Sequence, residues 1–301
     1  MADFGLIGSA GGRGDRPWLD HMRDLLEPLP PVFTTWWGSD HLQQYGRPWP
    51  EGWTRLTYLA AALPTFRVGH LVLSQSFRNP GLLAAMAATL QELSGGRLIL
   101  GLGAGWMEEE YRAFDYDYPS GGVRVAQLAE AIQIIRGLWT GEPTTFAGEW
   151  YRVDGAVCLR PKPAIPILVG TNGPKALKVA ARYADWWNWD GPWDVSYREP
   201  FERLGAACEE IGRPFDEITL TAGLSISMPD DPATFAATYT HDFYPGQVFA
   251  NVGPTPAEVI REIEILVDHG VRHIQLDVSS PAELRRFVDE VVPHVRLEPR
   301  R

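Results

Sequence analysis

Short apolar runs alternate with longer amphipathic segments along almost the whole chain of 301 residues, and this alternation constrains the fold most strongly. Unbroken apolar runs are typical of strands in a parallel sheet, because helices cover both faces of such a sheet. We predict strands at residues 4–7, 32–36, 68–73, 98–102, 166–169, 186–189, 218–228 and 273–278. We predict helices at residues 18–26, 55–63, 80–93, 123–138, 175–183, 201–211, 255–269 and 282–292. Strand–helix pairs that repeat in this way favour the α/β class, as a closed (β/α)₈ TIM barrel, over an open doubly wound sheet.

The predicted strand–helix pairs follow one another without a linker, so we expect a single domain over residues 1–301. Two insertions interrupt the rhythm: a hairpin at about 141–163, following the fourth strand and its helix, and an irregular stretch after the seventh strand. α/β barrels of this length routinely form one domain. The loops that follow the strands carry the chemistry in such barrels, so we search those loops for a site.

The formal net charge of −11 makes nucleic acid an unfavourable partner, because a negative surface repels phosphate backbones. No apolar run reaches the roughly 18 residues of a membrane span, and the first residues lack the pattern of a signal peptide. We therefore expect a cytoplasmic protein without a membrane partner. Cys158, Cys208 and the histidines have no spacing typical of a metal site, so we expect no bound metal.

Two glycine-rich loops follow predicted strands. Residues 101–105 read Gly-Leu-Gly-Ala-Gly, in which the third glycine comes too early for a dinucleotide fingerprint, so a tight turn and a close approach to a ligand both remain open. Residues 170–174 read Gly-Thr-Asn-Gly-Pro and open a helix, so their amides could bind an anion or form an ordinary turn. Lys175 and Lys178 would add positive charge to the second loop.

The loop after the second strand contains Ser39, Asp40 and His41. A carboxylate beside an imidazole can bind the N–H group of a heterocycle and move a proton, although a capped loop is the plainer interpretation. Tyr45 and Trp49 place aromatic rings nearby, and tryptophans at other strand ends, among them Trp106, suggest an aromatic pocket. The run 108–110 of three glutamates is typical of the first turn of a helix, from which one carboxylate could face the pocket.

Several motifs together resemble the bacterial-luciferase-like superfamily of flavin- and deazaflavin-dependent oxidoreductases. The resemblance covers residues 30–190 closely and the last barrel units more loosely. Within that superfamily, the chain is most similar to the members that use the deazaflavin coenzyme F-420. The motifs that carry the resemblance are Ser39-Asp40-His41, Ser76-Phe77-Arg78-Asn79-Pro80, the segments 92–97 and 101–106, Glu110-Tyr111-Arg112, the hairpin with 160–163, and the segments 170–174 and 180–185.

The resemblance implies a role for each part of the site. Asp40 would contact the polar edge of the deazaflavin ring, and His41 would lie near the centre of hydride transfer. Leu71 and Val72 would back the ring, at a place where such proteins often carry a cis peptide bond that does not precede proline. Residues 170–173 would hold the cofactor phosphate. A sugar-phosphate-oxidising member carries a carboxylate proton donor where this chain has Trp106, so we do not expect a sugar phosphate as the substrate.

Our sequence-based hypothesis is an F-420-dependent oxidoreductase that transfers a hydride to or from a small organic substrate. The alternatives are an FMN-dependent two-component monooxygenase of the same superfamily and a non-catalytic flavin- or F-420-binding protein. A homodimer and a reductase that supplies reduced flavin or F-420 are the partners we allow for. The candidate catalytic residues are His41, Tyr45 and Glu108. The candidate cofactor-binding residues are Asp40, Leu71, Val72, Gly103, Gly105, Glu109, Gly170, Thr171, Asn172 and Gly173.

Overall fold

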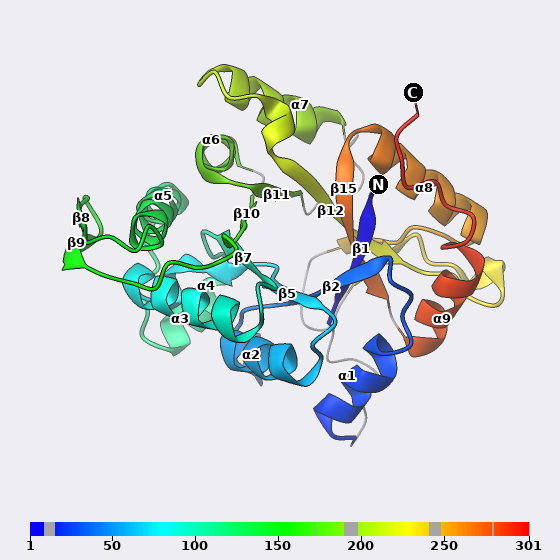
Figure 1. Cartoon of the computed structure of the whole chain (residues 1–301). Helices are drawn as coiled ribbons and strands as arrows, with labels where there is room; N and C mark the ends of the chain where they lie inside the picture. Colours follow the sequence, from blue (N-terminus) through cyan, green and yellow to red (C-terminus); the bar gives the residue numbers. More distant parts are fainter. Residues whose placement is uncertain (9–15, 172, 190–197, 241–247, 279, 301) are drawn as a thin grey trace. The chain divides into compact units, whose positions relative to one another are not determined.

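Strands and helices alternate along the structure of the protein, a computed structural model that describes residues 1–8, 16–171, 173–189, 198–240, 248–278 and 280–300 (Figure 1). The strands are β1 (Asp3–Ile7), β2 (Phe33–Gly38), β3 (Gln43–Gln44), β4 (Arg47–Pro48), β5 (Arg67–His70), β6 (Leu73–Ser74), β7 (Leu98–Gly103), β8 (Thr144–Ala147), β9 (Arg152–Ala156), β10 (Ile167–Gly170), β11 (Trp186–Trp189), β12 (Thr219–Ile226), β13 (Thr238–Thr240), β14 (Val248–Ala250) and β15 (Val271–Val278). The helices are α1 (Trp18–Leu26), α2 (Gly52–Ala62), α3 (Pro80–Leu93), α4 (Glu108–Ala113), α5 (Gly121–Leu138), α6 (Pro174–Tyr183), α7 (Arg198–Glu209), α8 (Pro256–Asp268) and α9 (Pro281–Glu290). Short 3₁₀ turns span Gln75–Phe77, Phe215–Glu217 and Pro232–Thr234.

The predicted strands and helices are present, with one difference of consequence. The strand predicted at 68–73 is divided into β5 and β6, and a cis peptide bond joins Leu71 to Val72 between them. Both predicted insertions are confirmed: β8 and β9 form the first, and β13 and β14 lie in the second. No helix in the described part of the chain is both long and apolar enough to cross a membrane.

The chain divides into two compact units, each built from segments that are distant in sequence. Unit 1 comprises Met1–Trp37, Asn188–Glu202 and Thr219–Arg301, and unit 2 comprises Gly38–Trp187 and Arg203–Ile218. The expectation of a single domain over the whole chain stays a prediction. Every candidate site residue named from the sequence belongs to unit 2.

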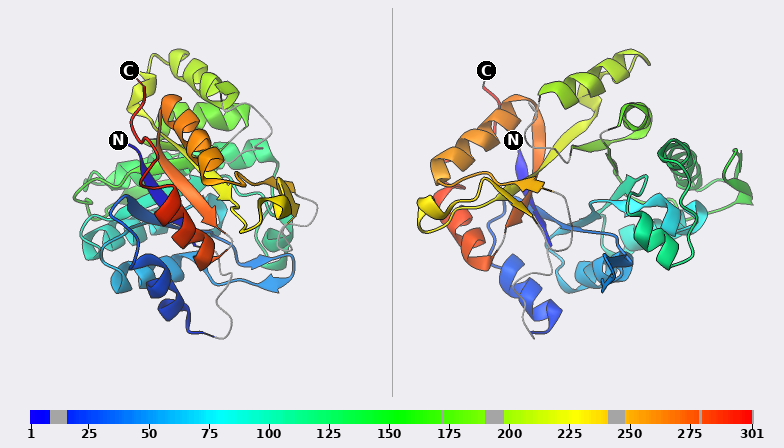
Figure 2. Two further views of the ribbon diagram at one scale, coloured as in Figure 1. Left: turned by 90° about the vertical axis from the view of Figure 1, so that its right-hand side faces the viewer. Right: turned by 180° about the vertical axis from the view of Figure 1, so that it is seen from behind.

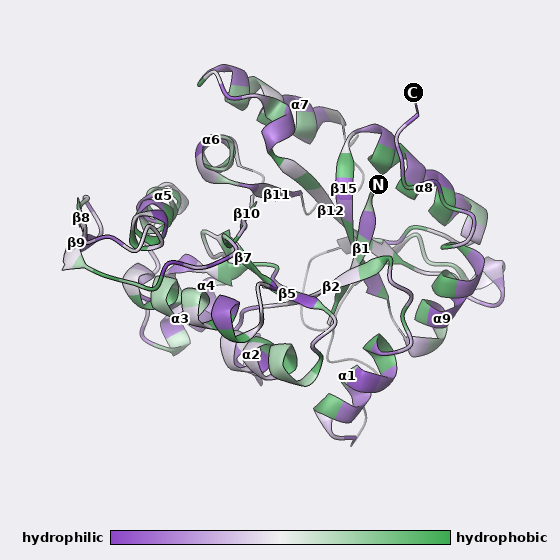
Figure 3. Cartoon of the chain, viewed as in Figure 1, coloured by the Kyte–Doolittle hydropathy of each residue, from purple (hydrophilic) through white to green (hydrophobic). Residues whose placement is uncertain are grey.

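Unit 1 is organised around parallel strands in the order β12, β15, β1 and β2. Three buried phenylalanine rings pack beside this sheet, since the Phe4 centroid lies 5.4 Å from that of Phe33 and 5.3 Å from that of Phe287. Helix α8 begins with the predicted capping box, in which Thr255 and Glu258 exchange hydrogen bonds. Hydrophilic and hydrophobic residues alternate along α8, as expected for a helix with one face against a core (Figure 3).

Unit 2 is organised around β7, which pairs in parallel with β5 and β6 on one side and with β10 on the other. All residues of β7 are buried, which explains its unbroken apolar sequence Leu-Ile-Leu-Gly-Leu-Gly. Helix α3 begins and ends where the sequence predicts. The side chain of Asn79 caps its first turn, and Gly95 and Gly96 follow its end with positive φ angles.

The hairpin β8–β9 lies beside α5 (Figure 1), and the view from behind agrees (Figure 2, right). The carboxylate of Glu130 on α5 accepts hydrogen bonds from the backbone amides of Glu149, Trp150 and Tyr151 at distances of 2.7–3.0 Å. The Tyr151 hydroxyl donates to Oε1 of Gln75, 2.7 Å away, in the segment that follows β6. The hairpin is therefore fastened both to α5 and to the strand-end region that contains the predicted site.

Candidate functional site

The loop after β2 is anchored by Asp40. Its side chain has no exposed surface, and its two carboxylate oxygens each accept a hydrogen bond from Arg78, at 2.9 Å. The backbone amide of Ser74 donates a third hydrogen bond to Oδ2, at 3.0 Å. Arg78 also pairs with Glu51, the N-cap residue of α2. These protein groups surround the carboxylate. The contact between Asp40 and a deazaflavin ring stays a prediction.

Glu51 completes this charged group at the start of α2. Partial burial opposes ionisation of its carboxyl group, but hydrogen bonds from Thr54, the Trp53 amide and Arg78 outweigh that effect and lower its pKa to about 2. Glu51 therefore carries a negative charge at neutral pH, as the pairing with Arg78 requires. Together Asp40, Glu51 and Arg78 fix the backbone on which His41 stands.

His41 is buried, and its ring is held by Glu110 of α4. The His41 Nδ1 atom lies 3.0 Å from Oε1 of Glu110, and the backbone amide of Leu42 donates to Oε2 of the same carboxylate at 3.0 Å. The rings of Trp106 and Trp49 stand edge-on to the imidazole, with centroids 5.9 Å and 6.5 Å away. The structure thus brings His41 and both tryptophans together, as the aromatic-pocket hypothesis expects.

The three glutamates of α4 differ in environment. Glu108 forms an ion pair with Arg112 on the helix surface, and Glu109 accepts a hydrogen bond from the side chain of Gln43 at 3.1 Å. Glu110 is the one whose carboxylate is buried against His41. The carboxylate beside the imidazole is therefore that of Glu110, and the roles predicted for Glu108 and Glu109 stay predictions.

Tyr45 occupies the turn between β3 and β4. Its φ angle is 48° and that of Gly46 is 71°, the pair of positive values that a two-residue type I′ hairpin turn requires. This position explains the local backbone, and the side chain is half-buried. The catalytic role predicted for Tyr45 stays a prediction.

The cis peptide bond expected from the family resemblance is present between Leu71 and Val72. Both side chains are half-buried at the end of β5. Two glycines from other strands, Gly103 and Gly170, lie against the side chain of Val72. A Cβ atom added to Gly103 would lie 2.5 Å from Cγ2 of Val72, and one added to Gly170 would lie 2.7 Å from Cγ1. Packing against Val72 therefore accounts for these two glycines, whereas their predicted contact with a cofactor is not tested.

The segment between β7 and α4 holds Trp106 in place through its backbone. Gly105 has a φ angle of 76°, and a Cβ atom there would collide with the hydroxyl of Tyr111. Nε of Arg124 donates to the Gly105 carbonyl at 3.3 Å, and the Tyr118 hydroxyl donates to the Trp106 carbonyl at 2.7 Å. The Trp106 side chain nevertheless keeps 46% of its surface exposed, so a fixed backbone presents an accessible indole beside His41.

The turn from β10 to α6 is built differently. Gly173 is the N-cap residue of α6 and makes no side-chain capping bond, and a Cβ atom added to it would meet nothing within 4 Å. The Thr171 carbonyl accepts a hydrogen bond from Nε1 of Trp187 at 3.0 Å, and Asn172 lies outside the described residues. The turn thus combines open space with the amides of a helix N-terminus, which suits an anion.

The two lysines proposed for this turn have different surroundings. Nζ of Lys175 lies 3.6 Å from the place that a Cβ atom would occupy on Gly122, in the first turn of α5. Lys178 instead pairs with Glu210 at 2.6 Å on the surface. Lys175 is therefore the lysine that adds positive charge near helix N-termini.

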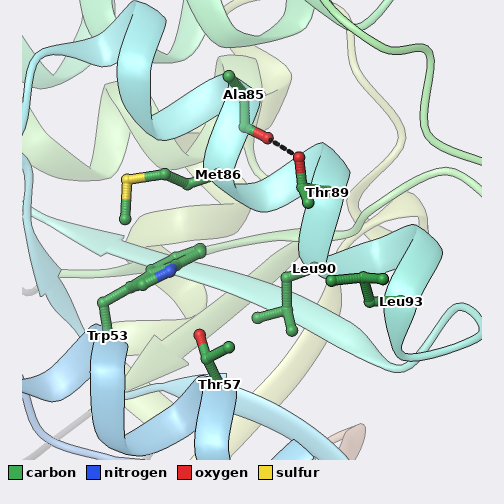
Figure 4. A pocket seen from close by; sticks show the side chains of 7 residues that line it. All are labelled: Trp53, Thr57, Ala85, Met86, Thr89, Leu90 and Leu93. Carbon is green, nitrogen blue, oxygen red and sulfur yellow. Dashed lines mark hydrogen bonds between the residues drawn. The ribbon is translucent and has the colours of Figure 1, made fainter. Parts of the chain in front are cut away.

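A separate surface hollow lies between α2 and α3, with a volume of about 350 Å³ (Figure 4). None of the site residues predicted from the sequence lines it. Its lining residues are Trp53, Thr57, Ala85, Met86, Thr89, Leu90 and Leu93. Among the residues that the structure describes, no group of acidic, histidine and cysteine side chains could hold a metal ion.

The sequence does not single out Glu110, Arg78 and Arg124, which the structure places against His41, Asp40 and the Gly105 carbonyl. The motifs that carry the family resemblance contain Glu110 and Arg78, but sequence spacing does not tell which partner each one reaches. Arg124 lies in a helix that the sequence predicts, and its contacts with the Gly105 and Pro119 carbonyls depend on how the preceding loop folds back.

Comparison with known proteins identifies the family. Residues 33–273 match the model of the luciferase-like monooxygenases. The chain is 34% identical over 302 residues to an F-420-dependent glucose-6-phosphate dehydrogenase of Kineococcus radiotolerans, covering 86% of this chain and 88% of that one. It is 31% identical over 238 residues to an F-420-dependent hydroxymycolic acid dehydrogenase of Mycobacterium tuberculosis, covering 76% and 63%.

Solved structures confirm the fold class. A structure of an F-420-dependent secondary alcohol dehydrogenase in complex with an F-420–acetone adduct matches with a TM-score of 0.77 and 20% sequence identity, covering 98% of this chain and 99% of that one. The fold is the predicted (β/α)₈ barrel. The sequence relatives confirm the predictions of an oxidoreductase and of coenzyme F-420 as its cofactor. The chain therefore belongs to the luciferase-like monooxygenase family.

Proposed function

We propose that the protein transfers a hydride between coenzyme F-420 and an alcohol, or the corresponding ketone, that carries no phosphate group. The observation that carries the proposal is the buried pair of His41 and Glu110, in which Nδ1 of the imidazole is engaged. Among the described residues, no hydrogen-bond partner is found for Nε2 of His41. An imidazole with one engaged and one unengaged nitrogen can receive or give a proton at the second nitrogen.

The residues of unit 2 fit a deazaflavin with a phosphate-bearing tail. Leu71 and Val72 offer half-buried apolar surface against which a planar ring could lie. Gly173 and the start of α6 would hold the phosphate, because their space is open and Lys175 adds a positive charge nearby. When bound, F-420 supplies the acceptor or donor of the hydride.

His41 would move the proton that accompanies the hydride. In alcohol oxidation, Nε2 of His41 takes the proton from the hydroxyl oxygen, and in ketone reduction it returns that proton to the carbonyl oxygen. The indole of Trp106 cannot replace it, because an indole N–H only donates and does not ionise in this pH range. Trp106 and Trp49 instead exclude water from the imidazole and give the substrate an apolar surface.

The charges around His41 support a substrate without phosphate. Arg78 is paired with Asp40 and Glu51, Arg112 is paired with Glu108, and Arg124 donates to backbone carbonyls. An anionic substrate group would have to compete with these partners. The relatives that act on a hydroxymycolic acid and on a secondary alcohol, according to their names, agree with such a substrate class.

Turnover of oxidised F-420 with a panel of secondary alcohols and with glucose 6-phosphate tests the proposal. We expect reduction of F-420 by one or more alcohols and none by the sugar phosphate. The variant His41→Gln should lower kcat by roughly 10²–10⁴, the usual contribution of general acid–base catalysis, with F-420 affinity unchanged within a few fold. Normal turnover by His41→Gln, or a preference for glucose 6-phosphate, would contradict the proposal.

A further inference from the structure

We propose that Glu110 is a positioning residue that fixes the tautomer and the orientation of His41, an inference that rests on the proposed proton transfer by His41. Glu110 acts through the imidazole and does not itself touch the substrate.

The two oxygens of the Glu110 carboxylate engage two residues that are adjacent in sequence, His41 and Leu42. Oε2 accepts the backbone amide of Leu42 at 3.0 Å, and Oε1 lies 3.0 Å from Nδ1 of His41. The Leu42 amide cannot move without moving the loop, so it fixes the carboxylate and leaves Oε1 directed at the imidazole. The Glu110 side chain is only 3% exposed, and a buried carboxylate is costly unless hydrogen bonds satisfy it. These two bonds provide that satisfaction.

This arrangement determines the tautomer. A carboxylate only accepts hydrogen bonds, so Nδ1 of His41 must carry the hydrogen, and the lone pair of a neutral ring must then be on Nε2. That is the tautomer that a base acting through Nε2 requires. With the other tautomer the ring would present N–H at Nε2 and could not take a hydroxyl proton.

The backbone on both sides of His41 is fixed as well. On the preceding side, Asp40 is held by Arg78 and by the Ser74 amide, and on the following side Leu42 is held by Glu110. Trp106 stands at 90° to the imidazole plane, so rotation of the ring would bring it against the indole. Glu110 thus selects the tautomer of a ring whose position is already restricted.

The first experiment measures the tautomer directly in the wild-type protein without cofactor or substrate. Long-range ¹H–¹⁵N spectra distinguish the two neutral tautomers, and the signal that is missing in His41→Gln identifies His41. We expect the form protonated at Nδ1. A ring protonated at Nε2 in the neutral wild-type protein would overturn the proposal. This readout does not depend on turnover, so it stands or falls separately from the proposed function.

The second experiment compares Glu110→Gln with Glu110→Asp. The glutamine can keep the Leu42 bond through its oxygen and present its NH₂ group to Nδ1, which would move the hydrogen of His41 to Nε2. We expect kcat to fall by roughly 10²–10⁴, as is typical of a triad whose orienting carboxylate becomes an amide, with KM and F-420 affinity changed by only a few fold. Glu110→Asp keeps the charge and should retain the Nδ1 tautomer and part of the activity.

Glu290→Gln is the matched control, because Glu290 ends helix α9, belongs to no predicted site, and accepts a hydrogen bond from Arg286 at 2.9 Å with its side chain 45% exposed. We expect wild-type kcat and the wild-type tautomer from this variant. If Glu110→Gln keeps the Nδ1 tautomer, or if Glu110→Asp is as inactive as Glu110→Gln, Glu110 has a structural role and the proposal fails. If the tautomer changes in Glu110→Gln while His41→Gln turns over normally, the positioning role stands and the proposed function fails.

Discussion

The loop after β2 and the turn after β10 belong to the same unit and both follow parallel strands, yet they are built in opposite ways. The loop after β2 buries its charges and gives each a partner, as the pairing of Asp40 with Arg78 and of His41 with Glu110 shows. The turn after β10 has exposed glycine at position 173 and no side-chain cap on α6. The charged groups of the first region are paired within the protein, whereas the second region begins a helix without a side-chain cap.

Helix α6 and the short helix α4 begin without a side-chain cap, unlike three other helices of unit 2. The side chain of Glu51 caps α2, that of Asn79 caps α3, and that of Ser120 caps α5. A helix start without such a cap leaves its first amides available to an anion. We infer that unit 2 separates two tasks: fixing an imidazole for proton transfer, and receiving a charged group from solution.

The largest expected effect comes from breaking the closed region. In Arg78→Met, the carboxylate of Asp40 loses both guanidinium bonds while its side chain has no exposed surface, so the charge is left buried without its partner. Removing one partner of a buried ion pair typically costs about 3–5 kcal/mol of unfolding free energy. Urea denaturation at neutral pH measures this loss.

Arg112→Met is the matched control for that variant. Arg112 pairs with Glu108 on the surface of α4, where the two side chains are 73% and 49% exposed. Exposed pairs of this kind contribute about 0–1 kcal/mol. If Arg78→Met were no more destabilising than Arg112→Met, the loop after β2 would not be the closed, charge-paired region described above.

Local signals predicted the fold well, because each helix start and stop is decided by a few neighbouring residues. The bounds of α3 follow from Asn79 and from the pair Gly95-Gly96, and those of α8 follow from Thr255 and Glu258. The division of the strand at 68–73 was not predicted, because the apolar pattern indicates one continuous strand. Only the cis peptide bond between Leu71 and Val72 was expected, and that from the family resemblance alone.

The site was predicted less completely, for a geometric reason. Successive residues of an α-helix differ in direction by about 100°, so the sequence Glu-Glu-Glu does not show which carboxylate faces inward. Burial of Met107 and Tyr111 sets the rotation of α4, and that rotation places Glu110 against His41. Likewise, the pairing of Asp40 with Arg78 joins residues 38 positions apart and depends on the packing of two loops.

A second prediction concerns the pH dependence of folding stability, and it depends on a buried histidine of unit 2. His70 on β5 is fully buried, its ring stacks on Trp53 with centroids 5.8 Å apart, and burial lowers its pKa from 6.5 to about 4. As pH falls, the unfolded chain binds this proton near pH 6.5, but the folded protein binds it only near pH 4. The stabilisation is therefore complete above pH 6.5 and is lost progressively down to pH 4, by an amount on the order of 3 kcal/mol.

The variant His70→Phe should flatten this part of the stability curve, because phenylalanine does not titrate and can keep the stack on Trp53. Urea denaturation at neutral pH and at several values down to pH 4 measures the slope. Gly173→Asn, which changes the open turn, should keep the wild-type slope and serves as the control. An unchanged slope in His70→Phe would assign the pH dependence to other groups.

The smallest expected effect tests the open turn. Gly173→Asp places a carboxylate at the N-cap of α6, where a side chain has room because a Cβ atom meets nothing within 4 Å. Asp caps a helix slightly better than Gly, so the unfolding free energy should stay the same or rise by a few tenths of a kcal/mol.

The carboxylate of Gly173→Asp would also occupy the amides proposed for the cofactor phosphate and repel the charge of that phosphate. The loss of charge-assisted hydrogen bonds worth about 1.5–3 kcal/mol corresponds to F-420 binding that is roughly 10- to 150-fold weaker. Gly173→Asn has nearly the same shape and capping ability without the charge, so it should weaken binding less than Gly173→Asp. Fluorescence titration of F-420 measures both affinities. Equal affinities for the aspartate and asparagine variants would mean that the phosphate binds elsewhere and that the open turn has another purpose.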